Sequence, residues 1–213
     1  MPTLEDISQF RRGLTDADII GSAKQPGDDF VDTHDTYTWY RAIGAAKVPA
    51  SILELGVRYG YSLIALGKGA CDAGSDSLGR CLKIVGIDAE TDGVQSNRVA
   101  RRYLRAVFPE ADVWIPDYNT CNPGSVNAIL GTSLNKFPFD IVHVDGDHSE
   151  TGIQNELVIA EQQIASDGWV LIDDIDTPHI KAVADEFCSK LGIIPLLIPT
   201  FHGLYLCDMG SKC

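Results

Sequence analysis

The sequence has 213 residues, a length that fits a single domain with a substantial hydrophobic core. Its formal net charge of -13 argues against a general surface for binding nucleic acids or anionic membranes. No apolar run approaches the roughly 20 residues that a membrane-spanning helix requires.

The cysteine pattern and the N-terminus indicate the compartment. The six cysteines include no C-x-x-C pair, and in a chain of this length they are interpreted as reduced thiols. The first residues, Met1 to Asp6, lack the basic start and apolar core of a signal peptide. We therefore expect a cytoplasmic protein with no nucleic-acid or membrane partner, and a homodimer remains an open option.

The first part of the chain, residues 1–48, is expected to form a helical N-terminal cover. Leu4 and Ile7 have helical spacing, and residues 24–29 form a turn-rich break. Residues 33–46 are expected to form a second helix with aromatic side chains on one side. These aromatic side chains either cover the edge of a sheet or roof a pocket.

From residue 49 to 213, strands and helices alternate, which is typical of a parallel sheet with helices on both faces. The expected strands are 51–55, 82–88, 111–115, 139–145, 168–173, 193–198 and 203–207. The expected helices are 61–70, 93–107, 149–165 and 178–191, with a further one near 123–131. The last two strands are joined too closely for a helical crossover, so they should form an antiparallel hairpin. The predicted fold is a single α/β domain over residues 1–213, a Rossmann-like three-layer sandwich with a seven-stranded, mostly parallel sheet.

A glycine turn after the first expected strand is the strongest local signal in the sequence. The apolar run 52–55 leads into Gly56 and Gly60, and an apolar-periodic segment follows. In an open α/β sheet, such a turn faces the crevice in which ligands bind, and glycine lets the backbone approach a ligand closely. Glu54 lies within the strand end, where a carboxylate without a ligand or partner would be unfavourable.

Two further acids follow the second and third expected strands. Asp88 can accept hydrogen bonds from both ribose hydroxyls of a nucleoside, although it can also cap the next helix. Asp117 either contacts an adenine amino group from the crevice or simply forms a turn.

Three more acids follow the fourth and fifth expected strands: Asp145, Asp173 and Asp174. Parallel strands end at the same side of a sheet, so these carboxylates should converge beside the glycine turn. Carboxylates that close repel one another unless a cation binds them or they take up protons. Oxygen ligands of this kind suit Mg²⁺, whereas each acid alone could instead cap a helix.

His148 lies three residues beyond Asp145 and should reach the same crevice. A side chain with an ordinary pKa near 6.5 can accept a proton at neutral pH, so His148 is a candidate general base. It could also be a metal ligand or an ordinary surface residue. His143 is expected to pack in the core, with its side chain alternating relative to Asp145.

Together these motifs resemble those of the class I S-adenosylmethionine-dependent methyltransferases. The run from Glu54 to Ser62 resembles the first motif of the catechol O-methyltransferase-like branch. The stretch from Val144 to His148, followed by Asp173 and Asp174, resembles the bacterial methyltransferase domain 24 group and the macrocin-type O-methyltransferases. The resemblance covers roughly residues 35 to 207.

The resemblance implies a role for each matching residue. The cofactor S-adenosylmethionine would be bound by Glu54, Gly56, Val57, Gly60, Tyr61, Ser62, Asp88, Ala89, Asp117 and Asp145. Mg²⁺ or a similar divalent cation would be bound by Asp145, Asp173 and Asp174. Asp145 and His148 would be the catalytic residues, with His148 in place of the lysine of the catechol enzymes. The implied activity is Mg²⁺-dependent methyl transfer to a hydroxyl group of a small molecule.

Two other functions are compatible with the same motifs. The chain could be a catalytically silent cofactor-binding subunit that supports another reaction, such as hydroxylation, in a natural-product pathway. A nicotinamide dehydrogenase would also use an acid at Asp88, but Gly56 and Gly60 do not follow the G-x-G-x-x-G order.

Overall fold

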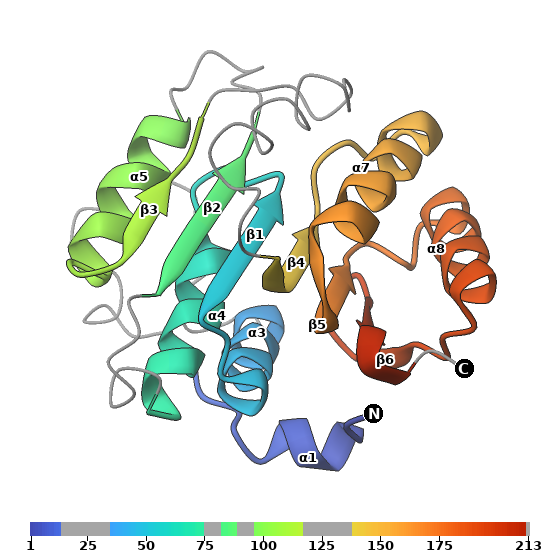
Figure 1. Ribbon diagram of the computed structural model, residues 1–213, viewed down its shortest axis with the longest axis horizontal. Helices are drawn as coiled ribbons and strands as arrows, with labels where there is room; N and C mark the ends of the chain where they lie inside the picture. The colour runs from blue at the N-terminus through green and yellow to red at the C-terminus, as the bar shows by residue number, and fades with distance from the viewer. Residues whose placement is uncertain (14–34, 75–81, 89–95, 117–137, 212–213) are drawn as a thin grey trace.

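A computed structural model of the chain describes residues 1–13, 35–74, 82–88, 96–116 and 138–211. Its centre is a seven-stranded sheet with the order β3-β2-β1-β4-β5-β7-β6 (Figure 1). The strands are β1 (Ser51–Leu55), β2 (Lys83–Ile87), β3 (Asp112–Trp114), β4 (Phe139–Val144), β5 (Ile164–Ile172), β6 (Leu196–Ile198) and β7 (Leu204–Asp208). Strands β1 to β5 are parallel, and β7 runs antiparallel to both β5 and β6. The predicted sheet and its C-terminal hairpin are therefore confirmed.

Helices cover both faces of this sheet. They are α1 (Leu4–Ser8), α3 (Asp35–Lys47), α4 (Tyr61–Asp72), α5 (Ser96–Val107), α7 (Glu150–Gln163) and α8 (Pro178–Leu191), followed by a 3-10 turn at Met209–Ser211. One hydrophobic core lies between the sheet and α3, α4 and α5, and a second lies between the sheet and α7 and α8. The helix predicted near 123–131 lies outside the described residues.

Helices α3 and α4 pack closely because glycines lie at their contact. A Cβ atom on Gly44 would lie 2.0 Å from the carbonyl oxygen of Leu66, and one on Gly69 would lie 1.9 Å from that of Arg41. Side chains at either position would push the helices apart. The close contact brings α3 over the carboxyl end of the sheet.

The alternation of side chains along the strands decides which residues share the face covered by α3 and α4. Ile52, Ile141 and Leu171 belong to the core on that face. Residues two positions further along a strand point to the same side. Glu54 and His143 therefore follow Ile52 and Ile141 on this face, at the carboxyl ends of β1 and β4.

Strand β5 begins earlier than predicted, at Ile164 rather than near residue 168. Ser166 and Asp167 are exposed within it, so the local pattern resembles a turn. The strand nevertheless pairs with Phe139 through Ile164, with a change of register before Trp169. An irregular strand with an exposed polar insertion cannot be recognised from alternation alone.

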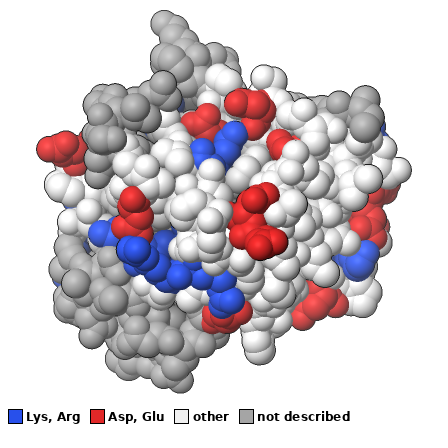
Figure 2. All heavy atoms as spheres, turned by 90° about the horizontal axis from the view of Figure 1, so that it is seen from below, with Lys and Arg blue, Asp and Glu red and all other residues white. Residues whose placement is uncertain are grey.

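The surface agrees with the composition. On the face shown in Figure 2, the described basic side chains form a band with acidic side chains at its ends, and a separate acidic group lies near the centre. None of the described helices combines the length and apolarity needed to span a bilayer. The described cysteines, Cys71, Cys188 and Cys207, form no disulfide bond, and the sulfur atoms of Cys188 and Cys207 lie 3.4 Å apart.

Candidate functional site

The glycine turn lies at the carboxyl end of β1, as predicted. Gly56 has a φ angle of 91°, and a Cβ atom there would lie 2.1 Å from the carbonyl oxygen of Asp145. Gly60 has a φ angle of 79° and occupies the N-cap of α4 without a side-chain cap. Glycine is therefore required at Gly56 by both backbone conformation and the close approach of the loop after β4.

Glu54 is fully buried beneath this turn. Its Oε1 atom accepts hydrogen bonds from the Ser62 hydroxyl and from His143 Nδ1, the latter at 2.6 Å. Its Oε2 atom is buried and has no hydrogen-bond partner in the described part of the chain. Burial raises the pKa of Glu54, while the bonds from His143 and Ser62 oppose that shift. A buried carboxylate oxygen without a partner is unfavourable, so it is available to a ligand that donates a hydrogen bond.

The acid after β2 lies against the same turn. Asp88 Oδ2 accepts a hydrogen bond of 2.5 Å from the backbone N–H of Arg58, whose φ angle is 46°. Val57 and Tyr61, also predicted at the cofactor site, are buried in the adjoining core. The predicted cofactor residues Ala89 and Asp117 lie outside the described residues.

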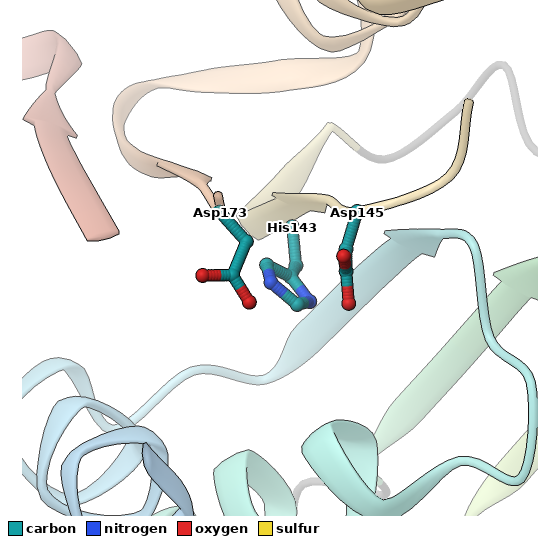
Figure 3. Close-up of side chains that lie close together, drawn as sticks. All are labelled: His143, Asp145 and Asp173. Carbon is teal, nitrogen blue, oxygen red and sulfur yellow. The ribbon is translucent and has the colours of Figure 1, made fainter. Parts of the chain in front are cut away.

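The acids after β4 and β5 also converge, as Figure 3 shows for Asp145 and Asp173. One ligand atom from each of His143, Asp145 and Asp173 lies within 4.8 Å of the others. The same holds for Asp145, His148 and Asp174. Asp145 thus belongs to both groups, whereas Asp173 belongs only to the first and Asp174 only to the second. A third such group consists of Asp174, Asp176 and His202. We call Asp145, Asp173 and Asp174 the acidic rim of the site.

The electrostatics of this rim follow from its concentration of carboxylates. Burial and the charge of Asp173 raise the pKa of Asp145 to about 6, although its ion pair with His148 opposes the shift. Burial and the same charge raise the pKa of Asp174. Asp174 also has a φ angle of 57°, which is unusual for a residue other than glycine. A divalent cation would relieve the repulsion that raises both pKa values.

His148 lies between two of the acids. Its Nε2 atom is 3.7 Å from Asp145 Oδ1, and its Nδ1 atom is 3.2 Å from Asp174 Oδ2. The ion pair with Asp145 and the charge of Asp174 outweigh partial burial and raise the pKa of His148 to about 9. With no cation at the acids, His148 therefore carries a proton at neutral pH.

The prediction that His143 alternates with Asp145 was wrong. His143 is fully buried, as expected, but residues two apart on a strand point to the same side, so it lies between Asp145 and Asp173 (Figure 3). Burial alone would lower its pKa, but the hydrogen bond to Glu54 and the charges of Glu54, Asp145 and Asp173 raise it to about 9. The signal available in the sequence was the two-residue spacing from Asp145.

Two other polar residues support the site and were not identified from the sequence. Tyr40 on α3 donates a hydrogen bond of 2.7 Å to Asp173 Oδ2 and lies 2.9 Å from His143 Nε2. Glu156 on α7 is fully buried and accepts hydrogen bonds from the backbone N–H groups of Gly146 and Asp147, at 3.2 and 2.9 Å. Glu156 thus anchors the loop that carries Asp145 and His148.

Comparison with protein families gives one match. The model of the family described as "Methyltransferase domain" matches residues 53–175, which include the glycine turn and all three acids of the rim. A comparison with curated proteins found no match.

Solved structures provide further comparisons. The S-adenosylhomocysteine-bound methyltransferase PaMTH1 of Podospora anserina has a TM-score of 0.63 and 17% identity, over 98% of this chain and 97% of its own. An O-methyltransferase from Bacillus cereus in complex with S-adenosylhomocysteine has a TM-score of 0.64 and 14% identity, covering 98% and 92%. The O-methyltransferase TomG from Streptomyces achromogenes, in complex with S-adenosylmethionine, has a TM-score of 0.56 and 18% identity, covering 81% and 78%. At these identities the comparisons establish a shared fold.

Proposed function

We propose a function from the premise that this chain belongs to the methyltransferase domain family, whose model matches residues 53–175. The protein transfers the methyl group of S-adenosylmethionine to a hydroxyl group of a small molecule, with assistance from a divalent cation. The observation that carries the proposal is that His143 bonds to Glu54, whose other oxygen has no partner in the described part of the chain, and offers a ligand atom within 4.8 Å of those of Asp145 and Asp173.

The residues of the turn fit the proposed cofactor. S-adenosylmethionine offers an ammonium group and two ribose hydroxyls as hydrogen-bond donors, and Glu54 and Asp88 are two carboxylates at the turn that can accept such bonds. Helix α4 begins at Tyr61, and its N-cap residue, Gly60, provides no side-chain hydrogen bond to the first turn. The B. cereus and S. achromogenes O-methyltransferases, which share the fold, were solved with S-adenosylhomocysteine and S-adenosylmethionine bound.

The residues of the rim fit a divalent cation. Asp145, Asp173 and Asp174 would hold it, with His148 close enough to Asp145 and Asp174 to contribute. Carboxylate oxygens suit Mg²⁺ and Mn²⁺, and burial together with the charge of Asp173 raises the pKa values of Asp145 and Asp174. When bound, such a cation makes a substrate hydroxyl more acidic.

The residues of the chain would then position the two reactants and manage one proton. The oxygen of the acceptor attacks the methyl carbon, the bond from that carbon to sulfur breaks, and the hydroxyl proton leaves to a base at the rim. His148 is the proposed base. Because Asp145 and Asp174 hold a proton on it in their charged form, the base role requires those charges to be compensated first.

A calorimetric and kinetic experiment tests this function. The protein should bind S-adenosylhomocysteine but not NAD, and it should methylate at least one acceptor from a broad panel of hydroxylated molecules when Mg²⁺ is present. EDTA and Asp145→Asn should each abolish turnover with much less effect on cofactor affinity. Full activity in EDTA would remove the metal from the mechanism. Tight cofactor binding with no methyl transfer to any acceptor would instead favour a silent cofactor-binding subunit.

A further inference from the structure

A continuous chain of buried hydrogen bonds links the two halves of the proposed site. It runs from the Ser62 hydroxyl to Glu54 Oε1, from Glu54 Oε1 to His143 Nδ1, from His143 Nε2 to the Tyr40 hydroxyl, and from that hydroxyl to Asp173 Oδ2. Glu54 belongs to the proposed cofactor subsite, and Asp173 belongs to the acidic rim. Glu54 and His143 are register partners on the adjacent strands β1 and β4, so the sheet itself fixes this part of the chain.

The donors and acceptors along this chain can be assigned. A tyrosine hydroxyl has one proton, and at Tyr40 it is donated to Asp173. The Tyr40 oxygen must therefore accept from His143, so Nε2 carries a proton, and Nδ1 carries the second ring proton, which it donates to Glu54 Oε1. All the bonds from His143 to Asp173 consequently point in one direction, and reversing any one of them would require the others to rearrange.

Both ends of the chain are held in a single orientation. Asp173 accepts from Tyr40 at Oδ2 and from the backbone N–H of Asp174 at Oδ1, at 3.0 Å. Glu54 has both its hydrogen bonds on Oε1, which leaves Oε2 as the atom that a ligand can reach. A ligand that binds at Oε2 therefore acts on a carboxylate whose other oxygen, Oε1, is linked to Asp173 by hydrogen bonds through His143 and Tyr40.

Tyr40 and His143 are not accessible to a ligand. Tyr40 is 1% exposed, and His143 is fully buried. Tyr40 is held in position by the close packing of α3 on α4, and its ring contacts the ring of His143 edge to face, with centroids 4.9 Å apart. These two residues can therefore act on the reaction only through Glu54 and Asp173.

We propose that Tyr40 and His143 are positioning residues that couple the cofactor subsite to the divalent-cation subsite, so that occupancy of one changes the affinity of the other. This inference rests on the proposed function, because it requires both ligands to bind. It adds to that function a specific physical connection between the two subsites. Coupling of this kind is reciprocal, so it can be measured from either side.

The test measures the Kd for Mn²⁺ by calorimetry, with and without saturating S-adenosylhomocysteine. In the unmodified protein, the nucleoside should change the Kd for Mn²⁺ by about 5-fold or more. In Tyr40→Phe the change should fall below about 2-fold, and the Kd itself should rise about 10-fold, as expected when a residue that orients a metal ligand is altered. A residue with a merely structural role would lower the melting temperature without removing the coupling.

Tyr205→Phe is the matched control. Tyr205 also donates its hydroxyl to a carboxylate, Asp185 Oδ1 at 3.0 Å, but it lies in the core on the other face of the sheet. This variant should retain the full coupling. If Tyr40→Phe does not fold, His143→Gln interrupts the same chain one bond further from Asp173 and should also abolish the coupling.

The outcomes separate this proposal from the proposed function. Binding of both ligands without coupling in the unmodified protein, or equal coupling in the unmodified protein and in the folded variants, overturns the role of Tyr40 and His143 alone. Failure to bind S-adenosylhomocysteine overturns the proposed function as well. Failure to bind Mn²⁺ overturns the coupling and the metal part of the mechanism, while the cofactor assignment stands.

Discussion

At the scale of single residues, Glu54 is the most informative side chain in the molecule. It is fully buried, one of its oxygens has two donors, and the other oxygen has none in the described part of the chain. A fold does not gain stability from an unsatisfied buried carboxylate oxygen. Its position is instead explained by a ligand that donates a hydrogen bond to it.

Glu54→Gln should therefore weaken binding of S-adenosylhomocysteine. Hydrogen bonds to charged groups contribute about 1.5–3 kcal/mol, so the Kd should rise roughly 10- to 100-fold. Calorimetric titration measures this directly. Glu161→Gln is a suitable control, because Glu161 forms an ion pair with Lys190 at the surface, at 3.0 Å. An unchanged Kd in Glu54→Gln would place the cofactor elsewhere.

The convergence of the acids could be predicted from the sequence, because the order of parallel strands determines where their ends lie. Asp145 forms one group with Asp173 and another with Asp174 for that reason. The contribution of Tyr40 could not be predicted, since it comes from a helix far away in the sequence and depends on how α3 packs on α4. The predicted contact between Asp117 and an adenine amino group stays a prediction, because Asp117 lies outside the described residues.

At the scale of structural elements, helix α7 supports the loop between Asp145 and Ser149. Ser149 caps the helix by accepting a hydrogen bond from the N–H of Gly152 at 3.0 Å. Glu156, two turns further on, accepts from the backbone of Gly146 and Asp147. A Cβ atom on Gly146 would lie 2.2 Å from Glu156 Oε1, so this contact also requires a glycine.

Glu156→Gln should loosen this loop. An amide offers one acceptor oxygen, and its NH₂ group would face a backbone N–H that needs an acceptor. The expected result is a loss of stability of about 1–3 kcal/mol in urea unfolding, together with a several-fold weaker affinity for Mn²⁺. Glu161→Gln on the same helix should change neither quantity. Unaltered Mn²⁺ affinity in Glu156→Gln would mean that the loop is held by other contacts.

Most elements could be located from their apolar patterns, because buried strands and amphipathic helices have distinct periods. The short C-terminal connection also predicted the hairpin correctly, and β7 pairs on both sides. The start of β5 could not be predicted, because the exposed Ser166 and Asp167 interrupt its apolar pattern. Residues 164–168 belong to the strand nevertheless, because Ile164 pairs with Phe139 of β4.

At the scale of the whole molecule, the site makes the folded protein retain protons that the unfolded chain would release. Glu54, with smaller contributions from Asp145 and Asp173, raises the pKa of His143 from 6.5 to about 9, and Asp145 and Asp174 raise that of His148 from 6.5 to about 9. The pKa of Asp145 is raised from 3.8 to about 6. A group with a raised pKa in the folded state binds its proton more tightly there than in the unfolded chain.

The metal-free protein should therefore become less stable as the pH rises from 6.5 to 9. The stabilisation from protonated His143 and His148 is complete below pH 6.5 and is lost as the pH passes through their folded-state values near 9. Asp145 contributes in the same direction between pH 3.8 and about 6. Thermal unfolding in EDTA at a series of pH values measures the effect, and His148→Gln should flatten part of the slope. A melting temperature that rises between pH 6.5 and 9 would contradict the proton assignments.

The position of Tyr40 has a practical consequence for anyone preparing shorter versions of this protein. The segment that matches the family model starts at residue 53, whereas Tyr40 lies on α3, which precedes β1. A fragment that begins at residue 53 would retain Asp145, Asp173 and Asp174 but would lose Tyr40, whose ring and hydroxyl contact the imidazole of His143. Gene fragments for expression, or for grafting onto another scaffold, should therefore start upstream of Asp35.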